Sequence, residues 1–117
     1  MTAYIKIPTI GEVLNEEFLI PLKISQNSLA KAIGVPQNRI SDIINGKRGI
    51  TADTDLRLTK YFGLSEGFFV RMQIGFERIE AKRKIKQELD KIVPLKRDDL
   101  VIAWSIYILY SSYYPFP

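Results

Sequence analysis

The sequence contains neither cysteine nor histidine among its 117 residues. The absence of cysteine excludes disulfides, zinc–thiolate sites and thiol nucleophiles. The absence of histidine removes the commonest general base and the commonest metal ligand. The chain also lacks a glycine-rich phosphate-binding loop. We therefore expect no enzymatic activity, no metal and no cofactor.

Long apolar runs are scarce as well. The N-terminus, MTAYIKIPTIGEV, has no segment that resembles a signal peptide. The most apolar stretch covers residues 100–110, whereas a membrane-spanning helix needs roughly 20 residues. We therefore expect a cytoplasmic protein that does not enter a membrane. The composition, 46% hydrophobic and 26% charged, is typical of one globular domain with a modest core.

The net charge of +4 is unevenly distributed. Residues 77–97 include eight basic and four acidic side chains, and residues 25–50 include four basic side chains and one acidic side chain. A protein with one face toward phosphates shows this asymmetry. Ordinary surface charge is the alternative explanation.

Residues 25–50, SQNSLAKAIGVPQNRISDIINGKRGI, predict two short helices joined by a tight turn. Ser25 suits the N-cap of the first helix, and Gly34 suits its left-handed C-terminus. Pro36 favours the start of a second helix. The apolar residues that recur at helical spacing are Leu29, Ala30 and Ile33, then Ile40, Ile43 and Ile44. The pattern predicts a helix-turn-helix, with an ordinary αα-hairpin as the alternative.

The side chains on the open side of the second helix suit double-stranded DNA. An amide such as that of Gln37 or Asn38 can donate to and accept from adenine in one plane, and Ser41 can read a base less strictly. The cations Arg39, Lys47 and Arg48 can neutralise phosphates without reading sequence. We therefore predict that this face binds DNA.

The flanking segments predict further helices. Thr9 and Glu12 form a capping-box pattern for a first helix, and Pro21 is predicted to end this helix or to lie just beyond it. Thr51 and Gly63 bound a fourth helix over residues 52–62, in which Ala52, Leu56, Thr59 and Phe62 fall at helical spacing. Ser65 is predicted to cap a fifth helix.

The region from Glu77 to Val93 predicts an amphipathic helix that Pro94 ends. One interpretation is a helix that covers the domain or its dimer partner. The alternative is an element that binds another protein. We divide the chain into a helix-turn-helix domain, residues 1–94, and a hydrophobic tail, residues 95–117. The tail is either a strand or helix that docks on the domain, or an interface with a partner, or an extension that the protein does not need. We expect the last of these.

Three segments resemble the HigA-type antitoxins of the XRE, or lambda-repressor-like, helix-turn-helix family. They are GEVLNEEFLIPLKISQNSLAKAIGV, GKRGITADTDLRLTKYFG and SEGFFVRMQ. The resemblance implies an all-α domain of five or six helices with a central helix-turn-helix. It also implies that Gln26 holds a phosphate and braces Gln37, that Gln37 reads a base, and that Asn45 contacts the DNA backbone. Asp55 departs from the small apolar residue frequent in the family.

The same resemblance implies the function. A HigA-type antitoxin represses its own operon and blocks a HigB-type toxin, a RelE-like ribonuclease that cleaves mRNA on the ribosome. If the predicted helix over residues 77–93 binds another protein, that protein is the toxin. The apolar stripe Phe68, Phe69, Met72 and Phe76 predicts either core or a subunit interface. The resemblance further implies a homodimer, in which the helix with this stripe packs on its own domain and contributes to the dimer contact. An XRE-family repressor without a toxin is the main alternative. A protein-interaction module that has lost DNA binding is another, although the two glutamines Gln26 and Gln37 argue against it.

Overall fold

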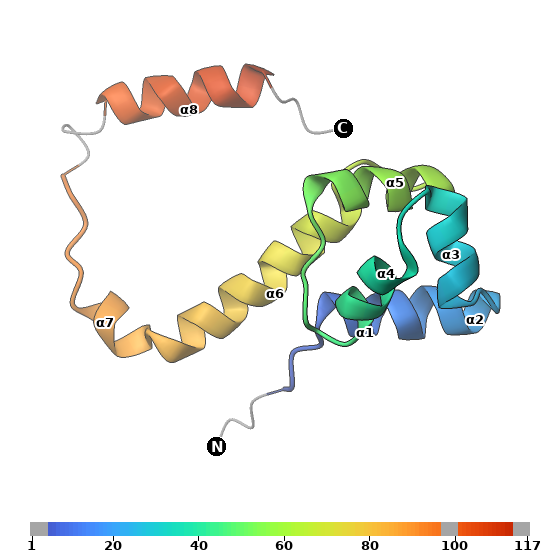
Figure 1. Cartoon of the computed structure of the whole chain (residues 1–117). Helices are drawn as coiled ribbons and strands as arrows, with labels where there is room; N and C mark the ends of the chain where they lie inside the picture. Colours follow the sequence, from blue (N-terminus) through green and yellow to red (C-terminus); the bar gives the residue numbers. More distant parts are fainter. Residues whose placement is uncertain (1–4, 97–100, 114–117) are drawn as a thin grey trace. The chain divides into compact units, whose positions relative to one another are not determined.

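The structure, a computed structural model, describes residues 5–96 and 101–113, and every regular element in these ranges is a helix (Figure 1). The elements are α1 (Ile10–Val13), η1 (Leu14–Leu19), α2 (Ile20–Leu22), α3 (Gln26–Ile33), α4 (Gln37–Ile44), α5 (Ala52–Phe62), α6 (Phe68–Lys84), α7 (Lys86–Asp90) and α8 (Val101–Tyr113). The predicted all-α fold is confirmed. Contacts divide the chain into two compact units, residues 1–84 and 85–117. Residue 94, the predicted boundary, lies within the second unit.

The first helix is continuous through α1, η1 and α2, and its middle is a π-helical turn. Thr9 caps it as predicted, since its hydroxyl accepts from the Glu12 N–H at 3.1 Å. The prediction that Pro21 ends the helix or lies just beyond it is wrong, because Pro21 lies inside α2. In the π turn the residue before Pro21 donates its N–H to the Asn15 carbonyl, five residues earlier. The regular i−4 hydrogen-bond pattern is thus already interrupted immediately before the proline, which has no N–H to donate. Lys23, in the left-handed conformation with φ 56°, ends the helix instead.

The helix-turn-helix has the predicted local structure. The Ser25 hydroxyl accepts from the Ser28 N–H at 3.0 Å, and Gly34 adopts the left-handed conformation with φ 72°. Pro36 immediately precedes α4, and Asn45 ends it. Ser25 and Gly34 satisfy free backbone groups at the two ends of α3. Pro36, at the start of α4, provides no side-chain cap, whereas the Asn45 N–H satisfies carbonyls at the end of this helix.

The core of the first unit is formed by side chains from the first helix and from α3, α4, α5 and α6. Its fully buried side chains include Leu14, Leu29, Ile40, Ile43, Leu58 and Phe69. Each such side chain contributes roughly 1.5–3 kcal/mol by leaving water. Gly11 allows α1 to lie directly against α4, because a Cβ at this position would collide with the Ile43 carbonyl. The burial of Ile40 and Ile43 and the close approach of α1 at Gly11 together fix the orientation of α4.

Helix α5 has the predicted bounds and caps, but its buried face differs from the predicted spacing. Ala52 and Leu56 are exposed, whereas Asp55 is only 2% exposed. The Asp55 carboxylate accepts from the backbone N–H groups of Gly67, Phe69 and Val70 at 2.7, 2.9 and 3.1 Å. It thus satisfies the free donors at the start of α6. The prediction that Ser65 caps this helix is wrong, since α6 begins at Phe68 and Asp55 supplies the acceptors.

The predicted helix from Glu77 to Val93 is not continuous. Helix α6 extends from the group of shorter helices to Lys84 (Figure 1). It ends where Ile85 takes φ −109° and ψ 20°, outside the helical region, and the short α7 then ends at Asp90. Three cations fill the last turn of α6, Lys82, Arg83 and Lys84, where the negative end of the helix dipole favours them.

The tail is helical over Val101–Tyr113; Leu100, the first residue of the predicted apolar segment, lies outside the described residues. Five successive side chains, Ile106 to Tyr110, are each more than half exposed. Within the described residues, no helix combines the length and the hydropathy that a membrane crossing requires.

Candidate nucleic-acid interface

Helix α4 separates its apolar and polar residues cleanly. Ile40 and Ile43 are fully buried, whereas Gln37 and Asn38, in its first turn, are exposed and Ser41 is half-buried. The exposure of the two amides is as expected from the sequence, and their contact with base edges stays a prediction. A short helix with amides at its N-terminal end has the geometry that recognition helices use in the major groove.

Gln26 and Gln37 are the first residues of α3 and α4, respectively. Gln26 is half-buried and Gln37 is exposed. Among the hydrogen bonds of the described residues, none joins the two amides. The bracing of Gln37 by Gln26 stays a prediction, which concerns the DNA-bound state.

Arg39 has a structural partner that sequence reasoning missed. Its Nη1 donates to Asp53 Oδ2 at 2.9 Å, and Arg57 Nε donates to Asp53 Oδ1 at 3.2 Å. Arg57 Nη1 also donates to the Ile33 carbonyl at 2.8 Å. The network ties α3, α4 and α5 together and restricts Arg39 as a phosphate ligand. The i, i+4 spacing of Asp53 and Arg57 could have indicated their own ion pair, but no sequence signal indicated that Asp53 also binds Arg39.

The pKa of Asp53 is lowered, chiefly by the hydrogen bond from Arg57 and further by the charge of Arg57 and by Arg39. A carboxyl group whose pKa is lower in the folded state than in the unfolded state adds to the stability of the fold at pH values above its unfolded-state pKa. The stabilisation is lost as the pH falls through the lowered pKa. The network is therefore intact at neutral pH.

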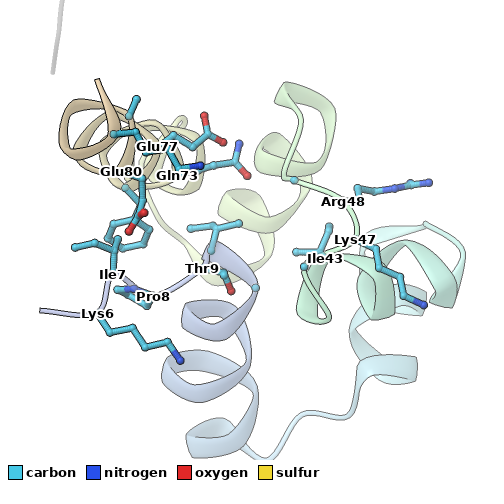
Figure 2. Close-up of a pocket in the computed structure, with 17 residues that line it drawn as sticks. Lys6, Ile7, Pro8, Thr9, Ile43, Lys47, Arg48, Gln73, Glu77 and Glu80 are labelled. Atoms are coloured by element: carbon cyan, nitrogen blue, oxygen red, sulfur yellow. The ribbon is translucent and has the colours of Figure 1, made fainter. Parts of the chain in front are cut away.

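The loop after α4 presents two exposed cations. Its backbone turns tightly, because the N–H groups of Lys47 and Arg48 both donate to the Asp42 carbonyl, at 2.8 and 3.3 Å. Figure 2 shows the Lys47 and Arg48 side chains pointing away from Glu77 and Glu80 of α6. Asn45, at the start of the loop, is exposed and its amide lies 3.5 Å from the Ser41 hydroxyl. The predicted phosphate-binding residues of the loop are thus available to a ligand.

A groove of about 790 Å³ lies beside this loop (Figure 2). One wall is the N-terminal segment, residues 6–11, and the other is α6. The residues of α6 that line it are Gln73, Phe76, Glu77, Glu80, Ala81 and Lys84. The lining mixes apolar, acidic and basic side chains.

One of the four residues predicted to contribute to a dimer interface is buried inside the protomer. Phe69 is fully buried within its own protomer, where its ring lies 5.2 Å from that of Phe18. Its assignment to an interface is therefore corrected, because this side chain has no exposed surface to offer. Phe68, Met72 and Phe76 are half-buried. For these three residues the dimer contact stays a prediction.

Comparison with known proteins places this geometry in a family. The family model described as "Helix-turn-helix" matches residues 16–69, which include α3, α4 and α5. The chain is 42% identical over 88 residues to virulence-associated protein I of Dichelobacter nodosus, with 75% of this chain and 81% of the relative covered. It is 31% identical over 87 residues to antitoxin HigA-1 of Vibrio cholerae, with 74% and 82% covered.

The chain belongs to the HigA family of helix-turn-helix antitoxins. A solved structure agrees: Pseudomonas aeruginosa antitoxin HigA with the higBA promoter has a TM-score of 0.70 and 33% identity. The alignment covers 78% of this chain and all of that one. The family resemblance deduced from the three sequence segments is thereby confirmed.

Proposed function

We propose that the chain binds operator DNA through α4, represses its own operon and neutralises a HigB-type, RelE-like mRNA-cleaving toxin in the cytoplasm. The exposure of Gln37 and Asn38 at the start of α4 is the observation that supports DNA binding most directly. A family member was solved with promoter DNA. The chain binds as a homodimer whose two recognition helices lie about one helical turn apart, roughly 34–36 Å.

The residues assigned to DNA divide into two classes. Gln37, Asn38 and Ser41 face base edges and confer sequence preference. The phosphate-binding class comprises Gln26, Asn45, Lys47 and Arg48. Arg39 acts mainly as a brace, since Asp53 already holds its guanidinium.

Lys47→Ala is expected to weaken binding to cognate and scrambled duplexes alike, and to reduce the salt slope of log K by about one unit. The Lys47 ammonium lies on an exposed loop and contributes charge, not base recognition. Titrations of both duplexes at several salt concentrations measure the slope. Lys60→Ala, which removes an exposed cation from the last turn of α5, is the control and should leave the slope unchanged. A loss confined to the cognate duplex contradicts the phosphate assignment.

Toxin neutralisation is tested by co-expression with the product of the adjacent gene. We expect that gene alone to arrest growth, this chain to restore growth, and the two proteins to co-purify. Growth unaffected by the neighbour, together with intact operator binding, identifies the chain as a repressor without a toxin. The family membership supports the antitoxin outcome.

A further inference from the structure

The side chain of Gln73 holds the backbone that follows the recognition helix. Its Oε1 accepts from the Ile50 N–H at 2.7 Å, and its Nε2 donates to the Ile50 carbonyl at 2.9 Å. We call these two hydrogen bonds the Gln73 clamp. Ile50 is 3% exposed and belongs to the core, so the clamp satisfies backbone groups that water reaches poorly. A side chain of α6 thereby anchors a point 23 residues earlier in the chain.

The Gln73 clamp fixes one end of the loop that presents Lys47 and Arg48. The other end is fixed by the two hydrogen bonds to the Asp42 carbonyl. Between them lies Gly49, where a Cβ would be 2.9 Å from Gln73 Oε1. The carboxamide therefore lies directly against the loop backbone, and the loop is held at both ends before any ligand arrives.

We propose that Gln73 is a positioning residue for DNA binding: it orients the loop so that Lys47 and Arg48 meet phosphates without further ordering. Gln73 itself belongs to the groove wall and is assigned no contact with DNA. A loop that is ordered in advance loses less conformational entropy on binding. The inference rests on the proposed DNA-binding function.

Gln73→Ala is expected to lower affinity for both cognate and scrambled duplexes by about tenfold, since a loosened loop affects the phosphate contacts and not base reading. Amide hydrogen exchange at Ile50 should accelerate, while amides within α4 keep their protection. Gln73→Glu keeps an acceptor for the Ile50 N–H but sets a carboxylate oxygen against the Ile50 carbonyl. It also adds a negative charge near the DNA-binding loop, so its loss should be at least as large as that of Gln73→Ala. Gln87→Ala, an exposed amide in α7, is the matched control and should change neither readout.

Gly49→Ala provides a second variant that disturbs the clamp without removing the amide. Its Cβ forces the Gln73 carboxamide to shift, so affinity should fall in the wild-type background. In the Gln73→Ala background the same substitution should cause little further loss, because the obstructing amide is gone. This double-mutant cycle isolates the coupling between the two positions. If Gln73→Ala fails to fold, the cycle cannot be completed, and the loss of affinity caused by Gly49→Ala alone then tests the inference.

The outcomes separate this inference from the proposed function. If the wild-type chain does not bind the operator, the proposed function is wrong, and the inference with it. If the wild-type chain binds and folded Gln73→Ala binds equally well, only the positioning role is overturned. Fully additive losses for Gly49→Ala and Gln73→Ala would overturn it as well, since the glycine would then act independently of the clamp.

Discussion

Gln37→Ala is expected to weaken binding to the cognate operator by about 1–3 kcal/mol, which corresponds to roughly 5- to 150-fold in affinity. Binding to a scrambled duplex should remain nearly unchanged. The Gln37 amide is exposed in the first turn of α4, and it can pair with adenine through one donor and one acceptor. Its loss leaves the base edge without partners but removes no charge, so the salt slope should also be unchanged.

The measurement uses the cognate duplex, a scrambled duplex and operators with one base pair changed in each half-site. The wild-type chain should discriminate against one particular change, and Gln37→Ala should lose that discrimination. Gln87→Ala serves as the matched amide control, because this side chain is exposed in α7 and outside the helix-turn-helix. The melting temperature should not change in either variant. Equal weakening of the cognate and scrambled duplexes would show that Gln37 does not read a base.

Features that depend on neighbours in the chain were predictable from the sequence. Ser25, Thr51, Gly34 and Gly63 act at helix ends as predicted, because a cap depends on a residue and the few backbone groups next to it. The exposed face of α4 followed from the apolar spacing on its opposite side. The same spacing identified Gln37 as exposed, which explains why this part of the candidate site could be predicted.

Features that depend on distant contacts were missed. Arg39 was assigned to phosphate from its charge alone, although its partner Asp53 lies 14 residues further along. Gln73 was read only as part of a helical segment, because its partner Ile50 lies 23 residues earlier. Neither pairing produces a periodic pattern. The π turn before Pro21 and the break at Ile85 were likewise missed, since helix propensity does not report either feature.

Asp55 is another residue whose role depends on distant contacts. From the sequence alone, it was distinguished only by replacing the small apolar residue that is frequent in the family. Its carboxylate acts as the cap of α6, accepting three backbone N–H groups from the residues Gly67, Phe69 and Val70. The positive end of α6 favours a negative charge at this position. The polar side chain is therefore tolerated in the core because both of its carboxylate oxygens accept hydrogen bonds from backbone N–H groups.

Asp55→Ala is expected to destabilise the fold by about 3–5 kcal/mol, because three backbone donors at a buried site lose a charged acceptor at once. For a domain of this size the melting temperature should fall by about 15–30 °C. The destabilisation should be largest at the start of α6, where Phe69 is fully buried and its N–H donates to the Asp55 carboxylate. Asp55→Asn should be intermediate, since it keeps one acceptor oxygen and replaces the other with a donor.

Thermal unfolding followed by circular dichroism measures these changes, and hydrogen exchange at Phe69 and Val70 localises them. Asp90→Ala is the control, because this carboxylate is exposed in α7 and its removal should change stability by less than about 0.5 kcal/mol. A fall of only a few degrees for Asp55→Ala would mean that water or a rearranged turn satisfies the three donors. In that case the carboxylate would be a tolerated substitution and not the cap on which α6, and through Gln73 the DNA-binding loop, depends.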